Sequence, residues 1–273
     1  MSTRTKFGSP PESDFTVTPT EEEVDFFREN GFLVVDRITT DEEIDWLRPI
    51  FEAAFDESNG KMAPQAKKAE IQTMFPEMRY PVLLETTYLR NARAYARALL
   101  GVDDVTSWGH MIRKPVGGSR IAPWHQDEAY WEPEVDYPKA LGTWLPLHDV
   151  TVEMGAMQFI PGSHRHGVFD HVFWDADPAH NLLEAVGAET STAVACPLTK
   201  GGCTIHDKRT LHFTEANSTN QPRYAFPIEH QVEPSLRAEP LRYEWVDQYR
   251  AAVGTTGYVP EGYIADGKLV RYE

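Results

Sequence analysis

The sequence predicts a mainly β fold, a sandwich or barrel, with flanking α-helices concentrated in its first part. Residues 103–232 consist of short apolar and alternating runs separated by turn residues, a pattern typical of antiparallel sheets. Residues 19–102 instead carry capped helical patterns. The chain has 273 residues, of which 41% are hydrophobic, including 7 Trp, 11 Tyr and 13 Phe. This composition supports a packed core and excludes global disorder.

The first helix is predicted from a capping box. Thr20 can accept a hydrogen bond from the backbone of Glu23, whose carboxylate can reach back to the cap. Asn30-Gly31 ends the pattern, because glycine suits a left-handed C-terminal cap. Three further elements are expected before residue 103: a strand at 32–38, a helix opened by Thr40 and Glu43 that runs to about residue 55 with Pro49 inside it, and a helix at 83–100.

The second part should form a sheet of short strands, followed by an irregular tail at 233–273 whose Trp245 and Tyr249 fold back on the core. The segment 168–190 is long enough to be a functional loop or lid. Residues 1–18 have the composition of a flexible terminus, which leaves one domain at 19–273. Strands are expected at 108–112, 140–147, 156–160, 193–198, 203–206 and 223–229.

Charge and cysteine content restrict the partners and the compartment. The 26 Lys and Arg against 42 Asp and Glu give a net charge of -16, which repels phosphate backbones and anionic lipid. We therefore expect no nucleic acid and no membrane as partner. The absence of an apolar signal core and the presence of only two cysteines favour a cytoplasmic location. Whether the chain forms a homo-oligomer stays open.

The chemistry of the chain is concentrated in Trp124-His125-Gln126-Asp127. Residues i and i+2 of an extended chain point to the same side, so His125 and Asp127 can converge on one point. His212 lies in a later run of strand character that a β-barrel could bring alongside. Two histidines and one carboxylate form the ligand set of non-haem Fe(II) oxygenases. A His-x-Asp sequence also arises by chance, so the pattern needs further support.

Arg223 supplies part of that support. It follows Pro222 at the expected start of a strand, where its guanidinium could bind a carboxylate through two parallel hydrogen bonds, as lysine could not. The alternative is a surface arginine paired with one of the many acids.

These residues belong to a longer set of motifs, which comprises 125–127, Trp144-Leu-Pro-Leu-His-Asp149, Glu153-Met-Gly-Ala156, Ile160-Pro-Gly-Ser-His164, His206-Asp-Lys-Arg-Thr-Leu-His212, Asn217 and Arg223. In order and spacing, this set resembles the phytanoyl-CoA dioxygenase-like (PhyH) family of Fe(II)- and 2-oxoglutarate-dependent dioxygenases.

The resemblance implies a double-stranded β-helix, also called a jelly roll or cupin-like core. It implies that His125, Asp127 and His212 bind Fe(II), and that Arg223 and Thr214 hold 2-oxoglutarate, which reacts with O2. Trp144 and His110 match positions near that cosubstrate, although His110 is equally a candidate for a buried core histidine. Because Asp127 is retained, halogenation is disfavoured, since related halogenases replace this carboxylate with alanine or glycine.

The expected activity is hydroxylation of an unactivated C–H bond in a small metabolite, with release of succinate and CO2. Desaturation, epoxidation or cyclisation in a biosynthetic pathway is an alternative with the same cofactors, and a non-catalytic jelly-roll metal- or ligand-binding protein is an alternative from another class. A CoA thioester would need a basic patch for its phosphates, and the nearby basic clusters are Arg113-Lys114, Arg120 and Lys208-Arg209. We favour a free, partly apolar metabolite, which needs no such patch. Candidate substrate-pocket residues are Tyr130 and Trp131, just after the metal pair, and Phe173 and Trp174 in the long loop.

Overall fold

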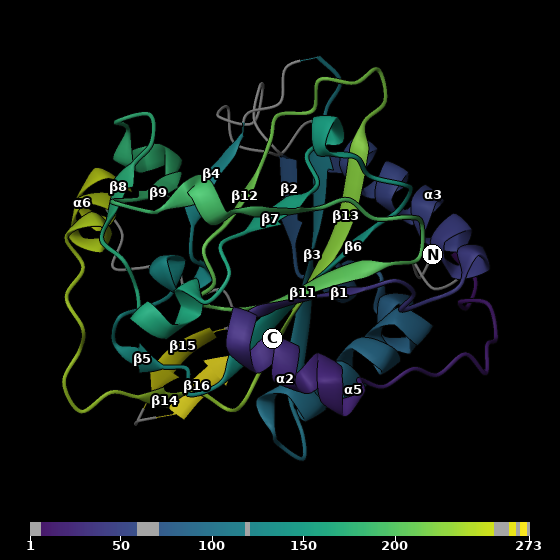
Figure 1. The fold of residues 1–273 in the computed structure, drawn as a ribbon, viewed down its shortest axis with the longest axis horizontal. Helices are drawn as coiled ribbons and strands as arrows, with labels where there is room; N and C mark the ends of the chain where they lie inside the picture. The colour runs from purple at the N-terminus through teal and green to yellow at the C-terminus, as the bar shows by residue number, and fades with distance from the viewer. Residues whose placement is uncertain (1–6, 59–70, 118–120, 254–261, 266–267, 272–273) are drawn as a thin grey trace.

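The computed structural model describes residues 7–58, 71–117, 121–253, 262–265 and 268–271. Two antiparallel sheets face each other and form a jelly roll, which confirms the fold class (Figure 1). The larger sheet has the strand order β1-β11-β6-β13-β3-β2 and the smaller one β10-β7-β12-β4. The larger sheet comprises β1 (Phe32–Val35), β11 (Cys203–Asp207), β6 (Ala140–Pro146), β13 (Arg223–Gln231), β3 (Thr106–Lys114) and β2 (Ile71–Met74); the smaller one comprises β10 (Val194–Cys196), β7 (Met157–Phe159), β12 (His212–Thr214) and β4 (Ala122–His125).

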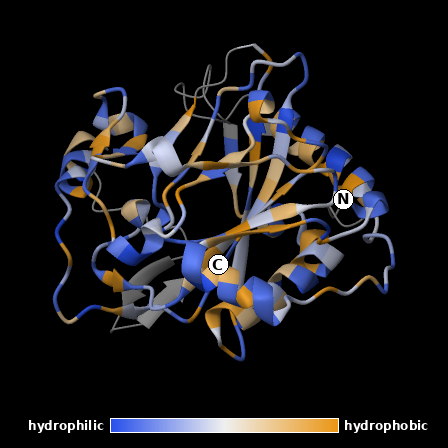
Figure 2. Ribbon diagram, in the orientation of Figure 1, coloured by the Kyte–Doolittle hydropathy of each residue, from blue (hydrophilic) through white to orange (hydrophobic). Residues whose placement is uncertain are grey.

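The central strands β11, β6 and β13 of the larger sheet are buried on both faces. The outer face is covered by helices α3 (Asp41–Ser58) and α5 (Thr87–Leu100), and its core includes Leu145 and Phe226 (Figure 1). The inner face packs against the smaller sheet through an apolar cluster that includes Trp144 and Phe159. Figure 2 shows hydrophobic residues along the strands between these layers. A side chain on the inner face therefore points toward the space between the two sheets.

The first helix, α2 (Glu21–Asn30), has both hydrogen bonds of the expected capping box and ends at Gly31 in the left-handed conformation. Helix α3 continues through Pro49 to Ser58, beyond the expected end. The prediction of one helix over 83–100 is wrong at its start. Pro81–Glu85 forms the 3-10 helix η2, and α5 begins only at Thr87, because the Thr86 side chain caps its first turn.

The strand predictions are right in place and differ in length. The first strand stops at Val35 rather than Ile38, because the chain turns there and the Ile38 N–H donates to the Gly201 carbonyl. The two strands at 106–114 and 223–231 are longer than expected and pair along their length. Both cysteines are buried and free, which agrees with the absence of stapling disulfides.

The long segment and the tail are more ordered than the sequence indicated. Within 168–190 lie the paired strands β8 (His171–Phe173) and β9 (Leu183–Ala185). The prediction of an irregular tail is wrong, because Glu244–Val253 forms helix α6, with the strands β15 (Gly262–Ala265) and β16 (Lys268–Arg271) beyond it. Trp245 does fold back, because its indole N–H donates to the Ala129 carbonyl at 2.9 Å.

The described part of the expected flexible terminus runs along the helices. The Phe7 carbonyl accepts a hydrogen bond from the Trp46 indole, and Phe15 accepts from Arg90 and Asn91. Across the described segments, no helix combines the length and hydrophobicity needed to span a bilayer.

A buried histidine on the outer face predicts a pH-dependent stability. His230 is fully buried, and its two ring nitrogens lie 2.9 Å from the Ser107 hydroxyl and 3.3 Å from the Thr143 hydroxyl. Burial, and next the charge of Arg93, lowers its pKa from 6.5 to about 3. Below pH 6.5 the unfolded chain therefore takes up a proton that the folded chain does not, so stability falls as pH falls.

As the pH falls from 6.5 toward the folded-state pKa of about 3, we expect this histidine to lower the free energy of unfolding by about 1.4 kcal/mol per pH unit. Urea unfolding with EDTA present, at pH 6.5 and pH 5, measures the loss. The wild type should lose about 2 kcal/mol more than His230→Gln between these values. Equal losses in the two proteins would contradict the assignment.

Candidate metal and cosubstrate site

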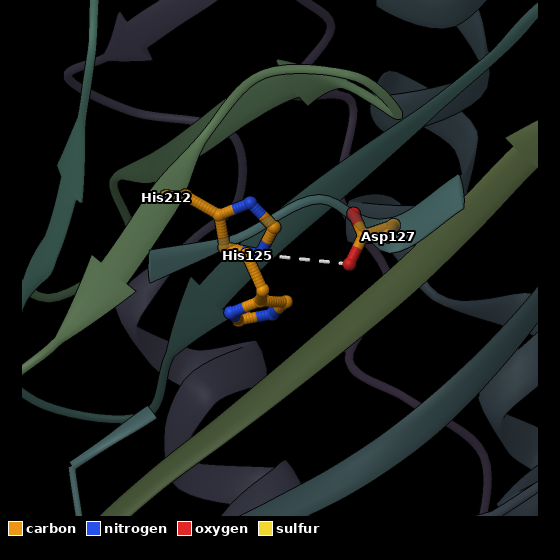
Figure 3. Close-up of side chains that lie close together, drawn as sticks. All are labelled: His125, Asp127 and His212. Atoms are coloured by element: carbon orange, nitrogen blue, oxygen red, sulfur yellow. Dashed lines mark ion pairs between the residues drawn. The ribbon is translucent and has the colours of Figure 1, made fainter. Parts of the chain in front are cut away.

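The two predicted histidine ligands face each other on neighbouring strands. His212 begins β12 and is the direct cross-strand partner of His125, the last residue of β4. Gln126 keeps the extended conformation, so Asp127 points to the same side before the 3-10 helix η3 (Asp127–Tyr130) begins. One ligand atom from each of His125, Asp127 and His212 lies within 4.8 Å of the others (Figure 3). The spacing argument from the sequence therefore holds.

Hydrogen bonds orient both imidazoles. The Nδ1 atom of His125 donates to the Pro123 carbonyl at 2.6 Å, and that of His212 donates to the Thr210 carbonyl at 2.9 Å. Since Nδ1 carries the proton in each ring, Nε2 carries the lone pair. Imidazoles that ligate metals are fixed in this way by their second nitrogen.

The protonation states also suit a metal. Burial acts to raise the pKa of Asp127, but the imidazoles of His212 and His206 outweigh it and hold that pKa well below its usual range. Burial, followed by the neighbouring His125, lowers the pKa of His212 well below 6.5. A carboxylate and neutral imidazoles are the forms that bind metal ions. The three residues therefore fit Fe(II), for which this donor set is characteristic.

A second group of candidate site residues lies further along the inner face. Arg223 begins β13, is fully buried, and donates through Nη1 to the Gly155 carbonyl at 2.9 Å. Its guanidinium carbon lies 5.1 Å from the centre of the Trp144 ring, which is itself buried. The ring face and the guanidinium thus attract each other, and the arginine is held in place. The structure brings together two of the residues that the sequence linked to 2-oxoglutarate.

Lys114 is a functional candidate that sequence reasoning missed. It is the direct cross-strand partner of Arg223 and is fully buried. Its ammonium group donates to the Thr214 hydroxyl at 2.5 Å and to the Glu215 carbonyl at 2.6 Å. The predicted hydroxyl of Thr214 is thereby tied to a second buried cation. Lys114 lies an even number of residues after His110 on one strand, a spacing that could have indicated its inward direction.

His110 is the cosubstrate candidate furthest from this group along β3. It pairs with Met74 of β2, shares the inward face with Lys114, and its ring centre lies 6.0 Å from that of Trp108. The assignment of a cosubstrate contact to His110 stays a prediction.

The four aromatic residues predicted for the substrate pocket have different surroundings. Tyr130 meets His125 edge to face with ring centres 5.5 Å apart, and its hydroxyl accepts from the Leu183 N–H of β9. Trp131 packs against Tyr137. Phe173 is buried in a cluster with Leu183 and Trp245, whereas Trp174 is 40% exposed. Tyr130 is thus in contact with a candidate metal ligand. The pocket role of all four stays a prediction.

Comparison with known proteins agrees with this geometry. The model of the phytanoyl-CoA dioxygenase (PhyH) family matches residues 27–225. The chain is 28% identical over 192 residues to the mouse phytanoyl-CoA dioxygenase domain-containing protein 1, and the match covers 67% of this chain but only 65% of the mouse protein.

Similar solved structures extend over more of the chain. EvdO2 from Micromonospora carbonacea var. aurantiaca, in complex with 2-oxoglutarate, has a TM-score of 0.76 and 30% identity, covering 85% of this chain and 99% of that one. The carbocyclase SnoK from nogalamycin biosynthesis has a TM-score of 0.67 at 21% identity over 85% and 98% of the two chains, and shows the shared fold. The fold, the arrangement of the candidate ligands and these matches are typical of oxygenases that depend on iron and 2-oxoglutarate. The chain belongs to the phytanoyl-CoA dioxygenase family.

Proposed function

We propose that this protein hydroxylates an unactivated C–H bond of a small free metabolite, with conversion of 2-oxoglutarate to succinate and CO2. The observation that carries the proposal is the cluster of His125, Asp127 and His212, which faces the same space between the two sheets as the buried Arg223. O2 is the oxidant, and Fe(II) and 2-oxoglutarate, when bound, would supply the electrons that activate it for attack on the C–H bond. The protein supplies position and exclusion of water.

The residues of the site divide these tasks. His125, Asp127 and His212 would hold the iron. Arg223 and Lys114 would bind the distal carboxylate of 2-oxoglutarate, because two buried cations on neighbouring strands favour an anion between them. The Thr214 hydroxyl, which accepts from Lys114, can donate its own proton to the same carboxylate. The Trp144 ring limits how far the guanidinium can turn.

A free metabolite is favoured over a CoA thioester by the contacts of the basic residues. Lys114 is buried beside Arg223. Arg113 lies over the Phe55 ring on the helix side of the sheet. Lys208 and Arg209 both pair with the buried carboxylate of Glu128. These cations are engaged within the fold, so they offer no patch for the CoA phosphates. Arg120, the remaining member of the clusters, lies outside the described residues.

The test is oxygen-dependent formation of succinate from 2-oxoglutarate by the Fe(II)-loaded protein, screened with free metabolites and with acyl-CoA thioesters. We expect a weak visible charge-transfer band when Fe(II) and 2-oxoglutarate are added without oxygen, and stimulation of succinate release by a free metabolite. Product analysis then distinguishes hydroxylation from desaturation, epoxidation or cyclisation. If neither a band nor succinate appears, the alternative of a non-catalytic jelly-roll binding protein gains support instead.

A further inference from the structure

His206 lies directly beside the candidate metal ligands, yet it is not one of the three. It is on β11, is 5% exposed, and its ring centre lies 4.6 Å from that of His212 and 5.4 Å from that of Phe159. Its Nε2 atom lies 3.0 Å from Oδ2 of Asp127. The other oxygen of that carboxylate, Oδ1, lies 3.5 Å from Nε2 of His212.

The surroundings of the ring define which nitrogen donates. Nδ1 of His206 is buried and has no hydrogen-bond partner among the described residues. A proton on Nδ1 would therefore lose its hydrogen bond to water without replacement, at a cost of about 1–3 kcal/mol. A proton on Nε2 instead meets the ionised carboxylate of Asp127 in a charge-assisted hydrogen bond. The Nε2–H tautomer is favoured on both counts.

We propose that His206 is a positioning residue for the metal centre, which by donating to Oδ2 holds Asp127 in one orientation and leaves Oδ1 as the metal-binding oxygen. This inference rests on the proposed function, because it requires the three residues to bind a metal. A carboxylate with one oxygen engaged in this way presents a single ligand atom beside His212. Without the donor, the carboxylate could rotate about its side-chain bonds, and part of the binding energy would be spent on ordering it.

Gly142 makes room for this arrangement. It is the direct cross-strand partner of His206 on β6. A Cβ atom at Gly142 would lie 3.1 Å from Cε1 and 3.2 Å from Nε2 of His206, and 3.2 Å from Oε1 of Glu229, so both side chains would have to shift by a few tenths of an ångström. Glycine in a strand interior often marks such a close approach. A substitution at Gly142 should therefore disturb the same hydrogen bond while the histidine remains.

Binding of Mn(II) alone, measured by isothermal titration and by electron paramagnetic resonance of the free ion, tests the proposal. We expect His206→Phe to weaken Mn(II) binding by roughly 10- to 100-fold, the range seen for partners that orient a ligand. His206→Gln places an amide N–H as many bonds from Cα as Nε2 and should bind within about threefold of the wild type, whereas the shorter His206→Asn should behave as the phenylalanine variant does.

Two further measurements separate positioning from a merely structural role. Gly142→Ala should weaken Mn(II) binding, and Gly142→Ala combined with His206→Phe should be no weaker than His206→Phe alone, because both changes break one contact. Melting temperatures without metal report folding; if the phenylalanine variant is unfolded, the Gln and Asn pair decides alone.

Wild-type affinity in His206→Phe, or equal affinity in the Gln and Asn variants, would overturn the positioning role. Failure of the wild type to bind Mn(II) would instead contradict the metal site and thus the proposed function.

Discussion

Asp127→Ala should give a folded protein that no longer retains Fe(II) and forms no succinate from 2-oxoglutarate. The change removes both a ligand atom and the negative charge that two buried imidazoles face. We expect the metal affinity to fall by more than about 100-fold, beyond the loss typical of residues that only orient a ligand. Anaerobic titration with Fe(II), followed by the charge-transfer band with 2-oxoglutarate, measures the change. The buffer should be free of chloride, which could occupy the vacated position.

Asp103→Ala is the matched control, because this carboxylate is exposed and lies outside the site. It should retain both the band and succinate formation. Because the neighbouring imidazoles outweigh burial and hold the pKa of Asp127 below its usual range, the ionised carboxylate stabilises the folded apo protein, and we expect apo Asp127→Ala to fold but to melt below the wild type. A band of unchanged intensity in Asp127→Ala would remove this residue from the ligand set.

Arg223→Ala should raise the KM for 2-oxoglutarate by on the order of 100-fold or more, while Mn(II) binding without cosubstrate stays near that of the wild type. The reason is the loss of two charge-assisted hydrogen bonds to a carboxylate, each worth about 1.5–3 kcal/mol. Because Arg223 is fully buried, the alanine variant also leaves a cavity. Arg223→Lys keeps the charge and most of the volume but not the fork, and we expect a KM increase of about tenfold.

Arg113→Lys is the control for that series. Arg113 immediately precedes Lys114 on β3, but it points to the helix side of the sheet, where its guanidinium carbon lies 5.3 Å from the Phe55 ring centre. The KM of Arg113→Lys for 2-oxoglutarate should equal that of the wild type. If Arg223→Lys and Arg223→Ala both showed wild-type KM values, the cosubstrate would have to bind elsewhere.

The candidate metal triad could be predicted because two of its members are close together in sequence. His125 and Asp127 converge through the geometry of one extended residue, Gln126, and this holds in the structure. The capping box of the first helix is local in the same sense. By contrast, the start of α5 at Thr87 was misplaced, because the pattern of apolar residues continues across Pro81–Glu85, although Thr86 caps a new helix.

The sequence did not identify residues whose proposed role depends on their partners on neighbouring strands. In the sequence Lys114 is one member of a basic pair, and its candidate role depends on its position opposite Arg223 and its hydrogen bond to Thr214. His206 was seen as part of a motif, and its bond to Asp127 joins β11 to the end of β4. Helix α6 was missed because its short amphipathic pattern follows a stretch rich in proline, and its anchor is the contact between Trp245 and Ala129.

The sequence by itself thus determined the class of fold and predicted the three candidate metal ligands and the candidate arginine for the cosubstrate, since spacing, turn residues and family motifs are properties of short segments. The tertiary structure alone decided which strands pair and in which register, and therefore that Lys114 lies opposite Arg223 and that His206 lies beside Asp127. Register is a non-local property: it depends on which faces of distant strands are buried together, and a shift by one residue would turn every one of these side chains to the opposite face.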